Sequence, residues 1–162
     1  MRNKAVNITV IAIFFSLLLH PLSLDAQVRY GIKAGVDYFS ASSLGGKVGA
    51  TAGFAVNIDF GAAGFSLQPE LDYVMKSPVG AHCVNVPVNL QWGPDLILFR
   101  PFIMVSPFVG AAFRPEKTLF DYGVGVGAGI DFWRMQLQIK YSWDLGTPEK
   151  LGGLDVSLLY FF

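Results

Sequence analysis

The chain has 162 residues, equal numbers of basic and acidic side chains, 52% hydrophobic residues and only 15% charged residues. This length suits a single domain, and zero net charge provides no basic field for nucleic acid. The high apolar fraction excludes intrinsic disorder. The scarcity of charge, with 18 glycines and 14% aromatic residues, is unusual for a soluble globule and indicates a protein with an apolar exterior.

Residues 1–26 have the layout of a secretory signal peptide. A basic start is followed by a nearly unbroken apolar run over residues 8–19, and Ala26 supplies a small residue before the expected cleavage. The apolar run is too short for a spanning helix, which needs about 20 residues. We therefore expect a mature domain of residues 27–162. Its single cysteine, Cys83, excludes an intramolecular disulfide.

The mature chain alternates apolar and polar residues with period two, and no helical period appears in it. Such alternation predicts strands that have one apolar and one polar face. Eight strands are predicted, in chain order, over residues 28–38, 47–60, 65–76, 83–92, 99–113, 121–132, 135–144 and 154–162.

The charges of these strands all fall on the polar faces. In a soluble barrel the apolar faces would form the core, but eight faces of aromatic and branched side chains would overfill a small barrel. The pattern therefore predicts an all-β, eight-stranded antiparallel up-and-down transmembrane β-barrel with a polar lumen and an apolar outer face. The charges expected to line the lumen are Arg29, Lys33, Asp37, Lys47, Asp59, Glu70, Asp72, Lys76, Arg100, Asp121, Asp131, Lys140, Asp144 and Asp155.

Closure and orientation follow from the membrane. Lipid offers no hydrogen bonds to an open sheet edge, so the sheet must close. An even number of strands places both termini on one side, taken as periplasmic.

The prolines at 69, 87, 101 and 107 each remove a ladder hydrogen bond or mark a bulge. Aromatic residues gather at strand ends, as in interfacial girdles: Tyr38, Phe60, Phe65, Trp92, Phe99, Phe113, Phe132 and Trp143.

The lumen charges allow two hypotheses, a solute path or an internal salt-bridged plug. An eight-stranded barrel is filled by its own side chains, and buried charges persist when they are paired, so we expect a plug. Four lumen-facing glycines, Gly123, Gly125, Gly127 and Gly129, form a groove that inward Phe102, Met104 and Phe108 could fill. The same glycines fit a dinucleotide-binding string, but that chemistry needs a helix after them, and here the strand alternation continues.

Catalysis and metal binding find little support. His82 lies beside Cys83 and near Ser77 at the second outer connection, but no motif supplies a third group to orient the histidine. One histidine and one cysteine cannot complete a zinc site. We read His82 as a solvated loop residue and expect no catalytic residue, cofactor or metal.

Several short motifs occur in order along the chain: Gly31-Ile32-Lys33-Ala34-Gly35, Leu67-Gln68-Pro69-Glu70-Leu71-Asp72-Tyr73, Val86-Pro87-Val88-Asn89-Leu90, Pro101 to Gly110, and Asp121-Tyr122-Gly123. In this order they resemble the small outer-membrane β-barrel family of the Bacteroidota, the PorT-like, porin-like barrels. Ser106 departs from the glycine expected there. The resemblance implies the barrel fold and the outer membrane, whereas the secretion role of the best-known relative does not transfer. Terminal Tyr160 and Phe162 are similar to the aromatic signal that the barrel-assembly machinery reads.

Together these patterns predict a non-enzymatic integral outer-membrane barrel with a structural, scaffold or surface-interaction role. Its expected partners are outer-membrane lipid, the assembly machinery during biogenesis and an unidentified protein, but no nucleic acid. The alternatives are a narrow solute pore, a secretion-accessory barrel, a rim-active lipid-modifying enzyme and a soluble secreted ligand-binding barrel.

Overall fold

The computed structural model describes residues 27–41, 45–61, 64–76, 81–113, 118–146 and 152–162, so the predicted signal peptide lies outside the described residues. Within these ranges, no helix is long and apolar enough to cross a bilayer. The elements are β1 (Gln27–Ala41), β2 (Gly45–Asp59), β3 (Phe65–Lys76), β4 (Ala81–Trp92), β5 (Arg100–Phe113), β6 (Thr118–Phe132), β7 (Met135–Asp144) and β8 (Gly152–Phe161).

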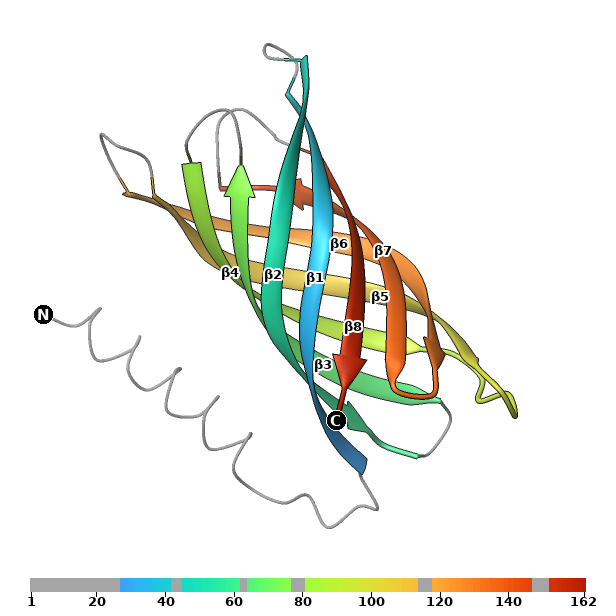
Figure 1. Ribbon diagram of the computed structural model, residues 1–162. Helices are drawn as coiled ribbons and strands as arrows, with labels where there is room; N and C mark the ends of the chain where they lie inside the picture. Colours follow the sequence, from blue (N-terminus) through green and yellow to red (C-terminus); the bar gives the residue numbers. More distant parts are fainter. Residues whose placement is uncertain (1–26, 42–44, 62–63, 77–80, 114–117, 147–151) are drawn as a thin grey trace, which may run out of the picture.

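The strands form one closed antiparallel barrel in chain order (Figure 1). Each strand pairs with its neighbour in sequence, and β1 closes on β8 with Gly31 opposite Phe161 and Ser40 opposite Gly152. The predicted eight-stranded up-and-down barrel is therefore confirmed. Strand ends differ slightly from expectation, since β5 begins at Arg100 rather than Phe99 and β6 begins at Thr118.

Of the four strand prolines named above, Pro69, Pro87 and Pro107 interrupt the ladder without changing its register. The β2–β3 pairing passes from Ala55↔Glu70 to Ile58↔Leu67, and so skips Pro69. Pro87 is skipped in the same way between β3 and β4, and Pro107 between β4 and β5. Each of these prolines still pairs on its other side, because a proline lacks only the N–H donor. Pro101 lies one residue from the start of β5 and stays in register with Ile130.

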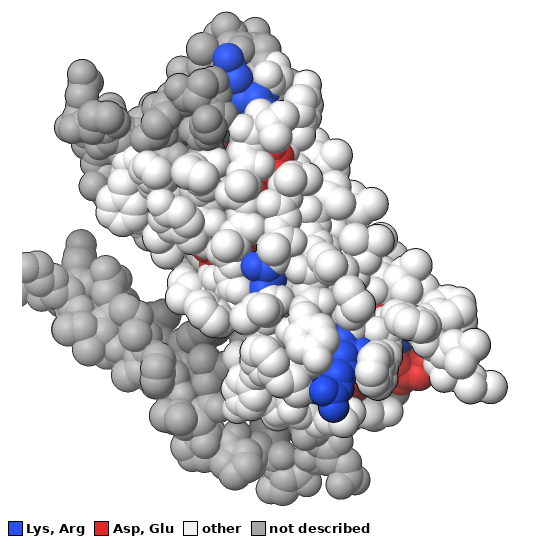
Figure 2. All heavy atoms as spheres, in the orientation of Figure 1, with Lys and Arg blue, Asp and Glu red and all other residues white. Residues whose placement is uncertain are grey.

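The wall of the barrel separates apolar from polar side chains. Outward residues such as Phe54, Ile103 and Ile139 are exposed, whereas the inward set is buried and largely polar. In the part of the chain whose side chains are described, the exposed charged residues are Asp95 and Arg134, and both lie in connections between strands. Figure 2 shows a face on which uncharged residues predominate. This arrangement inverts that of a soluble protein, whose apolar face is the core.

Both ends of the described chain lie at the same end of the barrel, because β1 begins there and β8 ends there (Figure 1). We call this the terminal end and the opposite one the distal end. The connections β2–β3, β4–β5 and β6–β7 also lie at the terminal end. The last is a two-residue turn, Trp133-Arg134, in which Trp133 adopts a positive φ of 55°.

Candidate functional site

The lumen holds the polar side chains of all eight strands, and these form two connected clusters. The central cluster consists of Lys33, Gln68, Glu70, Asp72, Asn89, Gln138, Lys140 and Asp155. The terminal cluster consists of Arg29, Asn57, Asp59, Ser66, Gln91, Asp95, Arg100, Asp131 and Gln136. Period-two alternation puts the strand residues there, since every second residue of each strand points inward; Asp95 lies in the β4–β5 connection.

The Glu70 carboxylate organises the central cluster. Its Oε1 accepts hydrogen bonds from Gln68 Nε2 at 2.7 Å, Asn89 Nδ2 at 2.6 Å and Gln138 Nε2 at 3.3 Å. Its Oε2 lies 2.8 Å from Lys33 Nζ and 3.8 Å from Lys140 Nζ. A buried carboxylate is tolerated when it is paired and hydrogen-bonded in this way. Glu70 thus links β3 to β1, β4 and β7 across the lumen.

Lys33 is the main cation of this cluster. Its ammonium lies 2.8 Å from both Glu70 Oε2 and Asp72 Oδ2, and 3.7 Å from Asp155 Oδ1. The Lys33 side chain is completely buried, so water does not screen these contacts. One ammonium therefore joins carboxylates of β3 and β8 to β1.

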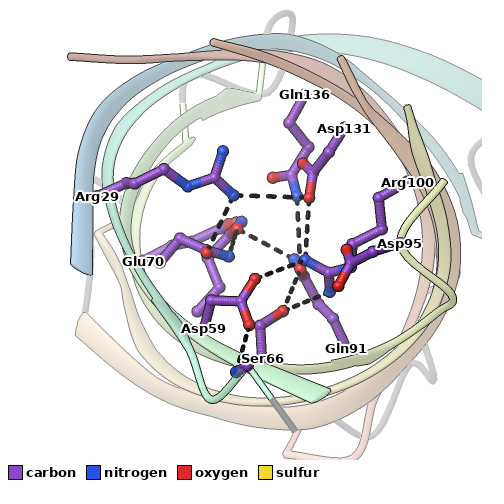
Figure 3. A network of polar contacts seen from close by, with 12 residues as sticks. Arg29, Asp59, Ser66, Glu70, Gln91, Asp95, Arg100, Asp131 and Gln136 are labelled. Carbon is purple, nitrogen blue, oxygen red and sulfur yellow. Dashed lines mark hydrogen bonds and ion pairs between the residues drawn. The ribbon is translucent and has the colours of Figure 1, made fainter. Parts of the chain in front are cut away.

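Arg100 has the corresponding position in the terminal cluster (Figure 3). Its guanidinium donates to Asp131 Oδ2 at 3.1 Å and to Ser66 Oγ at 2.6 Å. The same group lies 3.7 Å from Asp59 Oδ2 and 3.8 Å from Asp95 Oδ1. The planar guanidinium has five donors in a fixed fork, and it thereby connects four carboxylate or hydroxyl groups.

Arg29 completes the terminal cluster from β1. Its Nη2 donates to Asn57 Oδ1 at 3.2 Å and lies 3.6 Å from Asp131 Oδ2. The guanidinium carbon sits 4.8 Å from the ring centre of Phe161, a buried residue at the end of β8. This cation–π contact brings together the first and last strands beside the seam where the barrel closes.

Neutral side chains join the two clusters. Ser66 Oγ, which accepts from Arg100, donates to Gln91 Oε1 at 3.0 Å. Gln91 Nε2 then donates to Gln68 Oε1 at 3.1 Å, and Gln68 donates to Glu70. The result is one continuous hydrogen-bond chain from Arg100 to Glu70 along the inside of the barrel.

Two cavities lie on either side of this buried layer. The distal cavity has a volume of about 80 Å³, and the terminal recess a volume of about 450 Å³. They have no lining residue in common. Gln68, Asn89, Gln91, Gln136 and Gln138, all fully buried, belong to the layer between them.

The remaining predicted lumen charges lie toward the distal end. Asp37 is buried and accepts a hydrogen bond from Thr51. Asp121 and Asp144 are buried and line the distal cavity with Asp37. Lys47 is half-buried on β2. Lys76 ends β3, but its side chain lies outside the described side chains.

Three of the four predicted glycines of β6, Gly123, Gly127 and Gly129, face bulky side chains of β5. A Cβ atom added at Gly123 would lie 2.6 Å from Phe108 Cζ, at Gly127 2.7 Å from Met104 Cε, and at Gly129 2.4 Å from Phe102 Cζ. At Gly125 the nearest atom is the Ser142 hydroxyl oxygen, at 2.9 Å. Only glycine leaves room for the β5 side chains to pack against the wall of β6.

Valine at Gly129 is expected to destabilise the barrel by about 1–3 kcal/mol, because it overpacks the lumen against Phe102. The matched control is Ala128→Val on the outward face of the same strand, which should be nearly neutral. Urea unfolding in detergent, followed by circular dichroism, measures both. Equal midpoints for the two variants would show that the contact between Gly129 and Phe102 is not tight.

Sequence reasoning missed two parts of the network. The lumen site predicted from the sequence contained only charged residues and glycines, whereas buried amide side chains such as Gln68 and Gln138 make many of the hydrogen bonds in the lumen. Their signal was present, since they share the inward parity of the charges. Asp95 was missed because it lies in a connection, outside the strand pattern, and only the folded chain brings it to Arg100.

The discounted catalytic residues do not form a site among the described residues. His82 was expected in a loop, but this is wrong: it lies on the outward face of β4, because that strand begins at Ala81. Its Nδ1 is 2.6 Å from the Tyr73 hydroxyl, and the two rings stack. Cys83 is buried, and Ser77 lies outside the described residues. Within the described ranges, no group of three or more His, Cys, Asp or Glu side chains could hold a metal ion.

The C-terminal aromatics lie on the outer wall. Tyr160 and Phe162 are both exposed, and their rings meet edge to face with centroids 6.1 Å apart. Phe161, between them, points into the lumen. Backbone hydrogen bonds hold this end in place, since Phe162 N donates to Tyr30 O at 2.9 Å.

Comparison with solved structures identifies the same architecture elsewhere. The crystal structure of Neisserial surface protein A (NspA) matches with a TM-score of 0.60 and 13% identity, over 85% of this chain and 99% of that one. The N-terminal β-barrel domain of Pseudomonas aeruginosa OprF (TM-score 0.48, 10% identity, 84% and 100% covered) and Ail, the attachment invasion locus protein of Yersinia pestis (0.48, 11%, 85% and 99%), also match. The likeness to NspA shows a shared fold. No protein-family model and no curated protein sequence matches the chain.

Proposed function

We propose that this chain is an integral outer-membrane β-barrel with a plugged lumen and a structural, scaffold or surface-interaction role, without enzymatic activity. The observation that carries the proposal is the sidedness of the wall. Apart from His82, the described outward strand positions present apolar residues or tyrosine, and the described strand charges point inward. Such a surface is unfavourable in water and suits hydrocarbon. The fold shared with NspA, a surface protein of Neisseria, supports the same conclusion.

The buried layer of the lumen supports the plug. One continuous chain of hydrogen bonds runs through the layer from Arg100 to Glu70, and this layer separates the two cavities. An ion crossing the lumen would have to break these contacts, and each buried charge left unpaired is costly. The paired charges therefore serve to hold the strands together rather than to conduct.

The proposal includes location and biogenesis. Residues 1–26 export the chain, both termini face the periplasm, and outward Tyr160 and Phe162 are read by the assembly machinery. The PorT-like family of the Bacteroidota is the family to which we assign it, on the ordered motifs of the chain. A surface-interaction role requires a partner protein, which co-purification from native membranes would identify.

Location is tested by fractionation. After expression with its leader in a Gram-negative host, the protein should remain in the outer-membrane pellet through carbonate and high-salt washing. Such washes remove proteins held by charge but not those held by an apolar surface. Recovery in the soluble periplasmic fraction would overturn the membrane proposal and favour the soluble secreted barrel.

The plug is tested by conductance. The purified protein, reconstituted in planar bilayers, should show no stable open channel, whereas a porin with a wider barrel serves as the positive control in the same bilayers. The distal cavity, lined by five aspartates and Lys140, makes a narrow cation pore the second candidate function. Steady, saturable single-channel currents would favour this pore, with the lumen charges as its selectivity lining.

A further inference from the structure

The β4–β5 connection exposes four consecutive apolar residues at the terminal end of the barrel. We call residues 96–99 the apolar loop. Leu96 is 48% exposed, Ile97 102%, Leu98 74% and Phe99 42%. Runs of this kind are unfavourable in a water-facing connection. In Figure 1 this connection projects beyond the ends of the strands.

A backbone hydrogen bond and an ion pair hold the loop at the mouth of the terminal recess. Leu96 N donates to Phe99 O at 3.1 Å, which closes a tight turn. Asp95, just before it, points to Arg100 in the terminal cluster (Figure 3). The carboxylate therefore lies at the mouth of the terminal recess, and Ile97 and Leu98 at the tip are the most exposed side chains of the loop.

The apolar loop continues the outer wall. Phe99 has the outward parity of Ile103 on β5, and both are exposed. Phe132 and Trp133, which follow Asp131 at the end of the strand paired with β5, are also exposed and line the terminal recess with the loop. The indole of Trp133 is carried on a residue with φ of 55°, a conformation that bulky residues rarely adopt. These residues make the loop part of a rim of apolar and aromatic side chains.

We infer that the apolar loop is a membrane anchor whose side chains lie in the headgroup region of the leaflet at the terminal end. The inference rests on the proposed function, because only a barrel in a bilayer places this rim at an interface. Aromatic and apolar side chains at the end of a barrel lie at that boundary. Continuity of the loop with the lipid-facing wall favours lipid over a protein partner. The anchor holds the barrel at a set depth, while the Asp95–Arg100 pair ties the loop to the lumen network.

Depth-dependent fluorescence quenching tests the anchor. Ile97→Cys is made in a Cys83→Ala background and labelled with an environment-sensitive fluorophore. The mature protein is folded into phosphatidylcholine vesicles that carry nitroxides either on the headgroup or at mid-chain. Gln27→Cys, inward-facing at the same end, is the water control, and Ile139→Cys, midway along the outward face of β7, is the lipid control. Circular dichroism verifies that each variant is folded.

The label at Ile97 should emit at shorter wavelength than the label at Gln27, and headgroup nitroxides should quench it more than mid-chain ones. The label at Ile139 should show the opposite order of quenching. The label at Ile97 could instead match the label at Gln27 in emission wavelength and quenching, while the label at Ile139 is quenched by mid-chain nitroxides. That result would contradict the membrane anchor but leave the barrel proposal intact. If Ile139 also escapes lipid quenching, the barrel proposal itself fails.

A second variant separates the anchor from general misfolding. A label at Leu98→Cys should move to longer wavelength when Ile97→Asp is added, because a charged side chain withdraws the loop tip from the headgroup region. The circular dichroism of the barrel should stay unchanged. An emission maximum equal to that of the label at Gln27, with and without Ile97→Asp, would overturn the anchor, since the tip would then occupy water in both variants.

Discussion

Replacing Lys33 with alanine should lower the free energy of unfolding of the barrel by about 3–5 kcal/mol, the usual cost of removing one partner of a buried ion pair. The ammonium faces Glu70, Asp72 and Asp155 in a region without water screening. Its loss leaves three buried carboxylates with Lys140, 3.8 Å from Glu70, as the remaining nearby cation described in this cluster. Urea unfolding in lipid vesicles, followed by circular dichroism, measures the change.

The matched control is Ile32→Ala, one residue away on the outward face. It removes apolar contact with lipid but no charge pairing, so its effect should be clearly smaller. The Lys33→Met, Glu70→Gln double variant tests the pair itself, because removing both charges should restore part of the lost stability. A Lys33→Ala barrel as stable as the unmodified one would show that the central cluster does not hold the strands together.

Arginine at Ile139 should block insertion or cost about 2–4 kcal/mol, the penalty for a cation at the bilayer midplane on the lipid face of a barrel. Ile139 lies midway along β7, between Ala128 and Val156 on the neighbouring strands, and is 49% exposed. Val126→Arg on β6 should behave in the same way. The fraction of protein folded into vesicles reports the effect.

The structure determines which lumen position serves as the control. Gln138 has the required inward parity, but it is completely buried and donates to Glu70, so arginine there would disrupt the central cluster. Ser142, also inward on β7, is half-buried and lines the distal cavity beside several aspartates. Ser142→Arg should therefore fold and insert nearly as the unmodified protein does. Equal loss of insertion for Ile139→Arg and Ser142→Arg would contradict the assignment of the two faces.

Strand number, order and sidedness were all predictable from the residues alone. In a strand the direction of a side chain depends only on whether its position is odd or even. The alternation around Ile139 and Gln138 therefore assigned one to the wall and the other to the lumen without any tertiary information. Pro69, Pro87 and Pro107 marked interruptions of the ladder for an equally local reason, since a proline lacks an N–H wherever it lies.

Which lumen residues meet was decided only by the closed barrel. Lys33 and Glu70 are 37 positions apart, and their contact depends on the stagger of all the strands between and beyond them. The same stagger sets Gly129 opposite Phe102 and brings Asp95, a residue of a connection, to Arg100. Parity places a side chain on a face, but its height along the barrel axis and its partner across the lumen depend on strand register and tilt, which are properties of the whole sheet.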